Sequence, residues 1–110
     1  MVYIMSTSWF PAQQARVFGK RVLEALKKYP VNSTLTKVVL LGGVSASEEG
    51  IRTIAISEVV KGQTEKALAY TTQRSLFIAE GVDGYKYKIE VLMSAAKAMG
   101  TIDLKLPEDL

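Results

Sequence analysis

The segment from Thr36 to Val60 constrains the fold most, because both of its predicted strands are apolar on both faces. Residues 36–46 and 51–60 each have the length of a strand, and the turn Ser47–Gly50 between them is short enough for a hairpin. The apolar side chains of the first strand are divided between one face, with Val38, Leu40 and Val44, and the other, with Val39 and Leu41. A sheet with one face in water should alternate apolar and polar residues, so this sheet is expected to be covered on both faces.

A strand and a helix precede this hairpin. Residues 2–9 alternate as a first strand, and Pro11 fits the first position of the helix that follows, because the N–H that proline lacks would be unpaired there in any case. An apolar stripe at spacings of three and four indicates the helix: Ala15, Phe18, Val22, Leu26 and Tyr29. Pro30 follows the stripe, so the helix is expected to end before it.

A second helix and a last main strand follow the hairpin. Residues 63–80 predict the helix, and Gly81 is well placed as its C-terminal cap. Residues 85–91 alternate aromatic and aliphatic side chains with charged ones, which is typical of a strand. Ser94 can cap a short helix after this strand, and residues 101–106 could form a short extra strand.

The order of the main elements is strand, helix, strand, strand, helix, strand. This is the βαββαβ arrangement of ferredoxin-like α+β domains, and a chain of 110 residues suits one such domain over residues 1–110. Both helices would cover one face of a four-stranded antiparallel sheet. The other face is apolar too, and a chain this short gains from further burial. The sequence therefore predicts face-to-face pairing with a second copy, as a homodimer or a higher oligomer.

In length, element order, two-sided central strands and apolar C-terminal segment, residues 2–106 resemble the dimeric α/β-barrel superfamily. That group includes the antibiotic-biosynthesis monooxygenase-like, ethyl-tert-butyl-ether-degradation-like and stress-responsive barrel families. The resemblance implies a homodimer whose two sheets enclose a barrel. It also implies a ligand cavity, either between each sheet and its helices or inside the barrel. Residues 101–106 could then add to a sheet edge of the partner.

Some cofactor-free oxygenases and haem-degrading members of the resembled superfamily use tryptophan and asparagine near a pocket. The only asparagine of this chain is Asn32, and nothing in the sequence places it near Trp9. The histidine that the haem-degrading type requires is absent. The resemblance therefore does not extend to haem chemistry, and no cofactor is expected.

The chain contains no cysteine and no histidine. This excludes disulfides, thiolate nucleophiles, zinc-thiolate sites and histidine-based triads within the chain, and no metal site is expected. The net charge is only +3 and the basic residues are dispersed, whereas nucleic-acid binding usually needs a concentrated basic face. No basic leader or membrane-length apolar run is seen, so neither nucleic acid nor membrane is an expected partner, and the expected location is the cytoplasm.

Four residues are candidates for ligand binding: Trp9, Tyr70, Lys88 and Glu90. Trp9 and Phe10 could form an aromatic wall at a pocket mouth, or a staple that packs on the first helix. Lys88 and Glu90 could face a cavity and bind a small anion, or lie on a solvated strand face.

Two further pairs of residues have more than one structural interpretation. Thr71 and Ser75 could be pocket hydroxyls on the second helix, or could bond to carbonyls one turn back. Gly42 and Gly43 inside a strand predict a β-bulge or a close contact in a dimer.

Several functions remain open at this stage. The favoured one is a homo-oligomeric α/β-barrel protein that binds a small molecule. Alternatives are a cofactor-independent oxygenase or isomerase using Trp9, a tyrosine and Glu90 or Lys88, and an interaction module without a ligand. An RNA-binding module would need aromatic residues on its central strands, and residues 51–59 have none. A closed cavity containing a titratable group with a displaced pKa would favour an enzyme.

Overall fold

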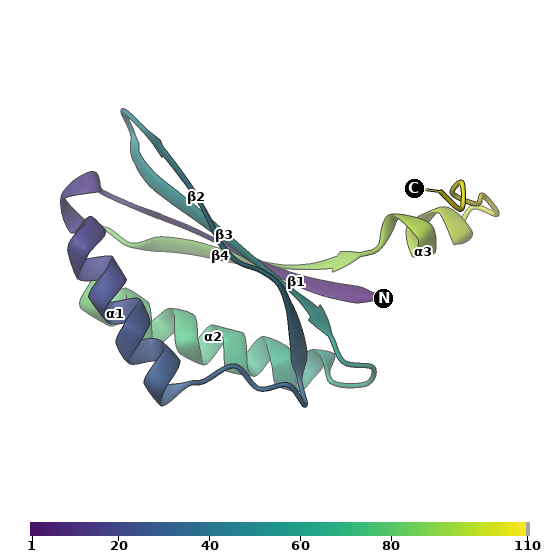
Figure 1. Cartoon of the computed structure of the whole chain (residues 1–110), viewed down its shortest axis with the longest axis horizontal. Helices are drawn as coiled ribbons and strands as arrows, with labels where there is room; N and C mark the ends of the chain where they lie inside the picture. Colours follow the sequence, from purple (N-terminus) through teal and green to yellow (C-terminus); the bar gives the residue numbers. More distant parts are fainter. Residues whose placement is uncertain (110) are drawn as a thin grey trace.

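The computed structural model describes residues 1–109 and confirms the predicted ferredoxin-like βαββαβ order (Figure 1). The main elements are β1 (Val2–Phe10), α1 (Ala15–Lys28), β2 (Thr36–Ser47), β3 (Gly50–Val59), α2 (Thr64–Gly81) and β4 (Lys86–Met93). A 3-10 turn, η1 (Ala12–Gln14), precedes α1, and a short helix, α3 (Ala95–Gly100), follows β4.

The four strands form one antiparallel sheet in the order β2-β3-β1-β4. Both long helices lie on the same face of this sheet, and the rest of residues 1–109 leaves the other face uncovered (Figure 1). Strand alternation divides β1 between the two faces, with Ile4, Ser6 and Ser8 toward the helices. The side chains that lie opposite them on β3 are Ser57, Ala55 and Thr53. The middle of the sheet therefore presents small side chains to the helix layer.

The apolar core is split into two clusters near the ends of this layer. The first core contains the buried residues Phe10, Ala25, Ile78 and Val82. The second core contains Ile4, Val59 and Ala67. Phe10 stacks on Phe18 of α1 with ring centroids 4.2 Å apart, so the aromatic residue at the end of β1 does pack on the first helix.

The ends of both long helices differ from the prediction. Pro11 is extended (ψ 145°) and precedes η1, so α1 begins only at Ala15. Gly81 is the last residue of α2 and not its cap, because the chain continues into an extended Val82. A Cβ atom at Gly81 would collide with the Arg21 side chain. Close packing of α1 against α2 explains this glycine better than a left-handed cap does.

The predicted bulge in β2 is confirmed, and it changes which residues share a face. The register of β2 against β3 shifts between Val38 and Leu40, and again between Leu40 and Gly43. Val38 lies opposite Ser57, on the helix side, whereas Leu40 lies opposite Ile56, on the uncovered side.

The predicted face assignment of β2 was therefore wrong in two places. Leu40 does not share a face with Val38 and Val44, and Leu41 lies on the same side as Val44 rather than opposite it. Simple alternation fails here because each extra residue in a bulge reverses the faces of the residues after it.

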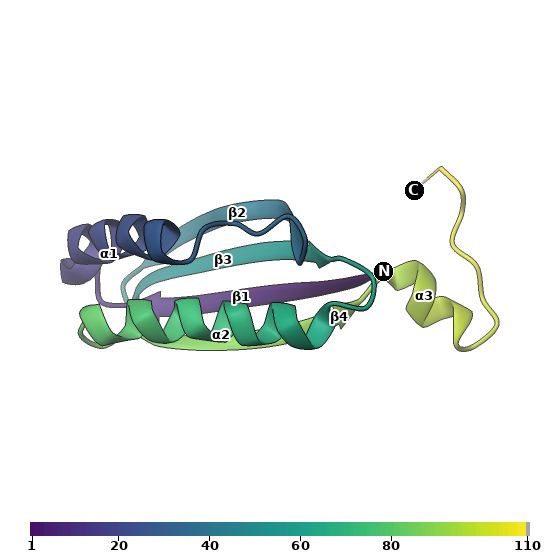
Figure 2. The same cartoon turned by 90° about the horizontal axis from the view of Figure 1, so that it is seen from below.

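The C-terminal segment extends away from the sheet (Figures 1 and 2). Ser94 caps α3 by accepting a hydrogen bond from the Lys97 amide, as predicted. Residues 101–106 form turns and irregular chain rather than the suggested strand, and Ile102 and Leu104 are exposed. Within residues 1–109 this segment pairs with no strand, so its addition to a partner's sheet stays a prediction.

Replacement of Gly50 by alanine is expected to destabilise the protein. Gly50 has a φ of +125°, and a Cβ atom there would lie 2.7 Å from the carbonyl oxygen of Phe10. Backbone strain of this kind costs about 1–3 kcal/mol, and urea denaturation should report a loss of that size. The control is Gly19→Ala on the exposed side of α1, where an added Cβ meets no other atom. It should raise the free energy of unfolding by about 0.5–1 kcal/mol, and equal effects of the two substitutions would contradict this account of the hairpin.

Candidate functional site

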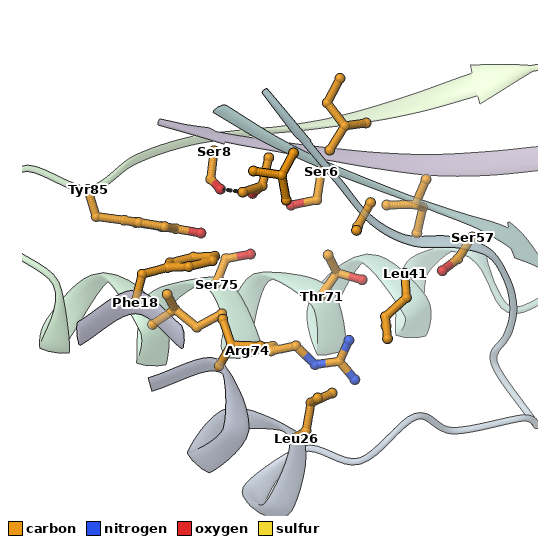
Figure 3. Close-up of a pocket in the computed structure, with 18 residues that line it drawn as sticks. Ser6, Ser8, Phe18, Leu26, Leu41, Ser57, Thr71, Arg74, Ser75 and Tyr85 are labelled. Carbon is orange, nitrogen blue, oxygen red and sulfur yellow. Dashed lines mark hydrogen bonds between the residues drawn. The ribbon is translucent and has the colours of Figure 1, made fainter. Parts of the chain in front are cut away.

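A cavity of about 420 Å³ lies between the sheet and the two helices (Figure 3). Ile4 of the second core and Phe18, which packs against the first core, both line it. The cavity exists because the facing side chains are short: Ser6 on the sheet lies across from Thr71 and Ser75 on α2, and Ala55 lies beside Ser6 on β3. Large aliphatic residues at these positions would fill the layer, as they do in ordinary protein interiors.

Apolar side chains form much of the cavity wall. Those on the helices are Phe18, Val22, Leu26 and Ile78, and those on β2 are Leu41 and Val44. Leu41 and Val44 are 62% and 71% exposed, because the helices do not cover the β2 edge of the sheet. The cavity therefore combines an apolar interior with an apolar rim along β2.

Hydroxyl groups supply most of the polar atoms in the wall. They belong to Ser6, Ser8, Thr53, Ser57, Thr71, Ser75 and Tyr85. Ser8 and Thr53 hydrogen bond to each other across β1 and β3, and Ser75 is buried. Because an uncharged hydroxyl can donate or accept a hydrogen bond, these groups can bind the carbonyl, hydroxyl or anionic groups of a ligand.

Tyr85 connects α2 to β4, and its ring packs against Phe18 with centroids 6.0 Å apart. Burial raises the pKa of the Tyr85 phenol above its ordinary value of 10.0, the nearby Ser8 hydroxyl lowers it in part, and Tyr87 raises it further. The phenol is therefore protonated at neutral pH. It can donate a hydrogen bond into the cavity, but it is a poor general base.

Arg74 of α2 carries the only charge in the cavity wall among residues 1–109. Its Nε and Nη2 atoms both donate to the carbonyl oxygen of Tyr29, at 3.2 and 2.8 Å. Its guanidinium also lies over the ring of Tyr70, 5.5 Å from the centroid. These contacts tie the C-terminal end of α1 to α2 and fix the position of the guanidinium.

The four residues predicted to bind a ligand do not form one site. Trp9 lies on the uncovered face of the sheet, opposite Arg52 and Lys86, and is 40% exposed. Lys88 and Glu90 lie on the same face and form an ion pair at 3.4 Å.

Tyr70 lies on the other side of the sheet. Its hydroxyl donates to the carbonyl of Pro30, and its ring meets Tyr29 edge-on. None of the four lines the cavity, so a ligand role for them stays a prediction.

Only part of the cavity wall was predicted from the sequence. Thr71 and Ser75, proposed as pocket hydroxyls, do line it, whereas Arg74 and the inward serines of β1 were overlooked. The sequence did contain an indication that these serines line a cavity. Ser6 and Ser8 occupy the helix-facing positions of a central strand, where large apolar residues are usual.

Comparison with known proteins supports the fold. No protein-family model matches the sequence, and a search of curated proteins finds no match. A conserved protein from Methanosarcina mazei Go1 has a similar structure, with a TM-score of 0.54 and 9% identity over 84% of this chain and 91% of that one. The de novo designed protein Foldit4 is similar at a TM-score of 0.51 and 13% identity, over 84% of this chain and 96% of that one.

A protein proposed to be an antibiotic biosynthesis monooxygenase, from Caulobacter crescentus CB15, is also among the structural neighbours. Its TM-score is 0.49 at 16% identity, over 86% of this chain and 89% of that one. At such identities structural likeness concerns the fold alone.

Among residues 1–109, no group of three or more carboxylates is close enough to hold a metal ion. No helix in this part of the chain has both the length and the apolar character needed to cross a membrane.

The titration of Tyr85 can be tested by ultraviolet absorbance. The Tyr85 phenol is expected to ionise at a higher pH than its ordinary pKa of 10.0 would give, as a late phase of the titration that Tyr85→Phe should remove. Since the pKa is raised on folding, the stability linked to it is complete below pH 10.0 and declines as the pH rises above that value. Tyr3→Phe, at the far end of β1 and outside the cavity, is the control and should leave the late phase in place. A late phase that persists in Tyr85→Phe would contradict the assignment.

Proposed function

We propose that this protein is a homo-oligomeric α/β-barrel protein that binds a small molecule in the cavity between its sheet and helices. The cavity itself carries the proposal. Its volume of about 420 Å³ falls within the range of about 300–1,000 Å³ that is typical of ligand sites. Its wall is largely apolar with a few convergent polar groups, which is the usual composition of such sites.

The placement of the polar groups favours a ligand over a purely structural role. Protein interiors normally contain few voids larger than a water molecule. Here the short side chains of Ser6, Thr71 and Ser75 leave a space that larger aliphatic side chains would fill. A chain selected only for stability would gain from filling this space, so the hydroxyls are best explained by contact with a bound molecule.

The titratable groups in the wall favour binding over proton transfer. Within residues 1–109 the wall contains no carboxylate, and the chain has no histidine. Tyr85 is the group in the wall with a displaced pKa, but burial raises that pKa above its ordinary value of 10.0, so the phenol stays protonated at neutral pH and offers no base. An isomerase or oxygenase acting by proton abstraction would need a base from elsewhere, whereas a binding protein needs none.

The uncovered face of the sheet supports association with a second copy. On that face Leu40, Ile56 and Met5 lie side by side across β2, β3 and β1. An apolar patch in the middle of a sheet is typical of interaction surfaces, and face-to-face sheet packing would bury it. We therefore propose a homodimer formed through this face.

Ligand binding can be tested with N-phenyl-1-naphthylamine, an uncharged fluorescent probe of apolar sites. We expect saturable binding with about one probe per chain, and loss of binding in Ser6→Leu, because the larger side chain would fill the middle of the cavity. Gln73→Leu, on the exposed side of α2, adds a comparable apolar group outside the cavity and should bind the probe normally. Equal binding by both variants would mean that the probe occupies another surface, and the cavity would lose its proposed role.

The oligomer can be tested by size-exclusion chromatography with light scattering. The wild-type chain is expected at about twice its monomer mass of 12.1 kDa, and Ile56→Glu should reduce the mass to that of a monomer by placing a charge in the interface. Val17→Glu, on the exposed surface of α1, is the matched control and should remain dimeric. A wild-type mass of one chain would refute the proposed dimer.

A further inference from the structure

We infer that the cavity binds an anion with an apolar body, and that Arg74 holds its carboxylate group. This inference rests on the proposed function, because it names the chemical class of the ligand for the same cavity. It depends on four features of Arg74: its position, its remaining donors, the absence of an acidic partner, and the contrast with Arg21.

Arg74 is half-buried and directed into the cavity. In Figure 3 its guanidinium points along the space between the helix layer and the sheet, toward the end where Leu26 and Leu41 lie. The hydrogen bonds from Nε and Nη2 to Tyr29 orient the group. A guanidinium fixed in this way loses little further freedom when it binds a ligand.

Three N–H donors of Arg74 remain after these contacts, two on Nη1 and one on Nη2. No hydrogen bond from them to another group is present within residues 1–109. Two donors on the outer edge of a guanidinium match the two oxygens of a carboxylate, and such paired, charge-assisted bonds are strong. The hydroxyls of Thr71 and Ser57 line the same cavity and could donate to the same anion.

Among residues 1–109 no acidic side chain forms an ion pair with Arg74. The ion pairs found among residues 1–109 involve Arg21, Lys88 and Lys105, and none involves Arg74. A partly buried charge is costly unless it is paired. A negatively charged ligand would supply the missing partner.

Arg21 provides an internal contrast, because it makes nearly the same contacts from the other helix. Its Nε donates to the carbonyl of Phe77 at 2.8 Å, and its guanidinium lies over the Phe77 ring at 3.6 Å. However, Glu24 and Glu80 lie within 4 Å of Arg21, and Arg21 does not line the cavity. Both arginines join the two helices, but only the one inside the cavity lacks a carboxylate.

The rest of the wall indicates the body of the ligand. Phe18, Val22 and Ile78 provide an apolar surface on the helix side of the cavity. A ligand with a single carboxylate at Arg74 could place an aromatic or aliphatic body against this surface. A highly charged metabolite would bury its other charges against apolar side chains and be disfavoured.

The test compares three probes that share one apolar body: 4-phenylbutyrate, 4-phenylbutanol and 4-phenylbutylamine. Binding is measured by calorimetry, and the site is located from amide shifts in ¹⁵N-labelled protein. We expect the carboxylate to bind about 10- to 100-fold more tightly than the alcohol, the amine to bind most weakly, and the shifts to include Thr71 and Ser75.

In Arg74→Gln the carboxylate should lose its higher affinity relative to the alcohol, while the alcohol should bind about as well as before. Arg74→Lys should keep part of the preference.

Arg21→Gln is the matched control, because it removes the same charge from an equivalent position outside the cavity. It should leave the preference for the carboxylate unchanged. If Arg74→Gln does not fold, the order of the three probes on the wild-type protein still decides the question.

Equal affinity for the three probes would overturn the inference and leave the proposed cavity function standing. A carboxylate preference that survives in Arg74→Gln, or shifts confined to Lys86–Lys88 on the uncovered face, would also overturn it. If all three probes fail to bind while N-phenyl-1-naphthylamine still binds, the inference of an anionic ligand is overturned and the proposed cavity function remains. Failure of that neutral probe as well would remove the proposed function itself.

Discussion

The architecture depends on the pairing of β1 with β3, which sets small side chains against each other in the middle of the sheet. Ser6 lies opposite Ala55, and Ser8 lies opposite Thr53. These four residues are too short to reach the helix layer. The helices are instead supported near the ends, where Phe10 contributes to the first core and Ile4 to the second. The cavity is the consequence of this division, since the sheet residues between the two cores have small side chains.

Two arginines hold the helices over this open space. Arg21 of α1 donates to a carbonyl of α2, and Arg74 of α2 donates to the carbonyl of Tyr29 at the end of α1. Aromatic rings pack beneath both guanidinium groups. Such contacts can join two helices without a continuous apolar interface between them and the sheet. The glycine at position 81 belongs to the same arrangement, because any side chain there would displace Arg21.

The sequence was sufficient to predict the fold, because element order and alternation are local properties. The faces of β1 and β4 followed from alternation alone. The faces of β2 did not, because the positions of its two register shifts depend on pairing with β3. The cavity was harder to predict than the strand faces, since it is defined by space that side chains leave empty. Trp9, the largest aromatic residue, was predicted to bind a ligand, yet alternation places it on the face away from the helices, opposite Arg52.

Alternation along β3 also separates the two proposed roles of the sheet. Ala55 and Ser57 line the cavity, whereas Ile56, between them in sequence, has a position on the uncovered face. A substitution at one set therefore changes one face directly and the other only through the backbone they share. Because strands are stiff and hydrogen bonded on both sides in the middle of the sheet, ligand binding and self-association should be separable by single substitutions. Coupling between them would have to pass through a change in the twist of the sheet, because neighbouring residues such as Met5 and Ser6 of β1, or Ala55 and Ile56 of β3, have positions on opposite faces.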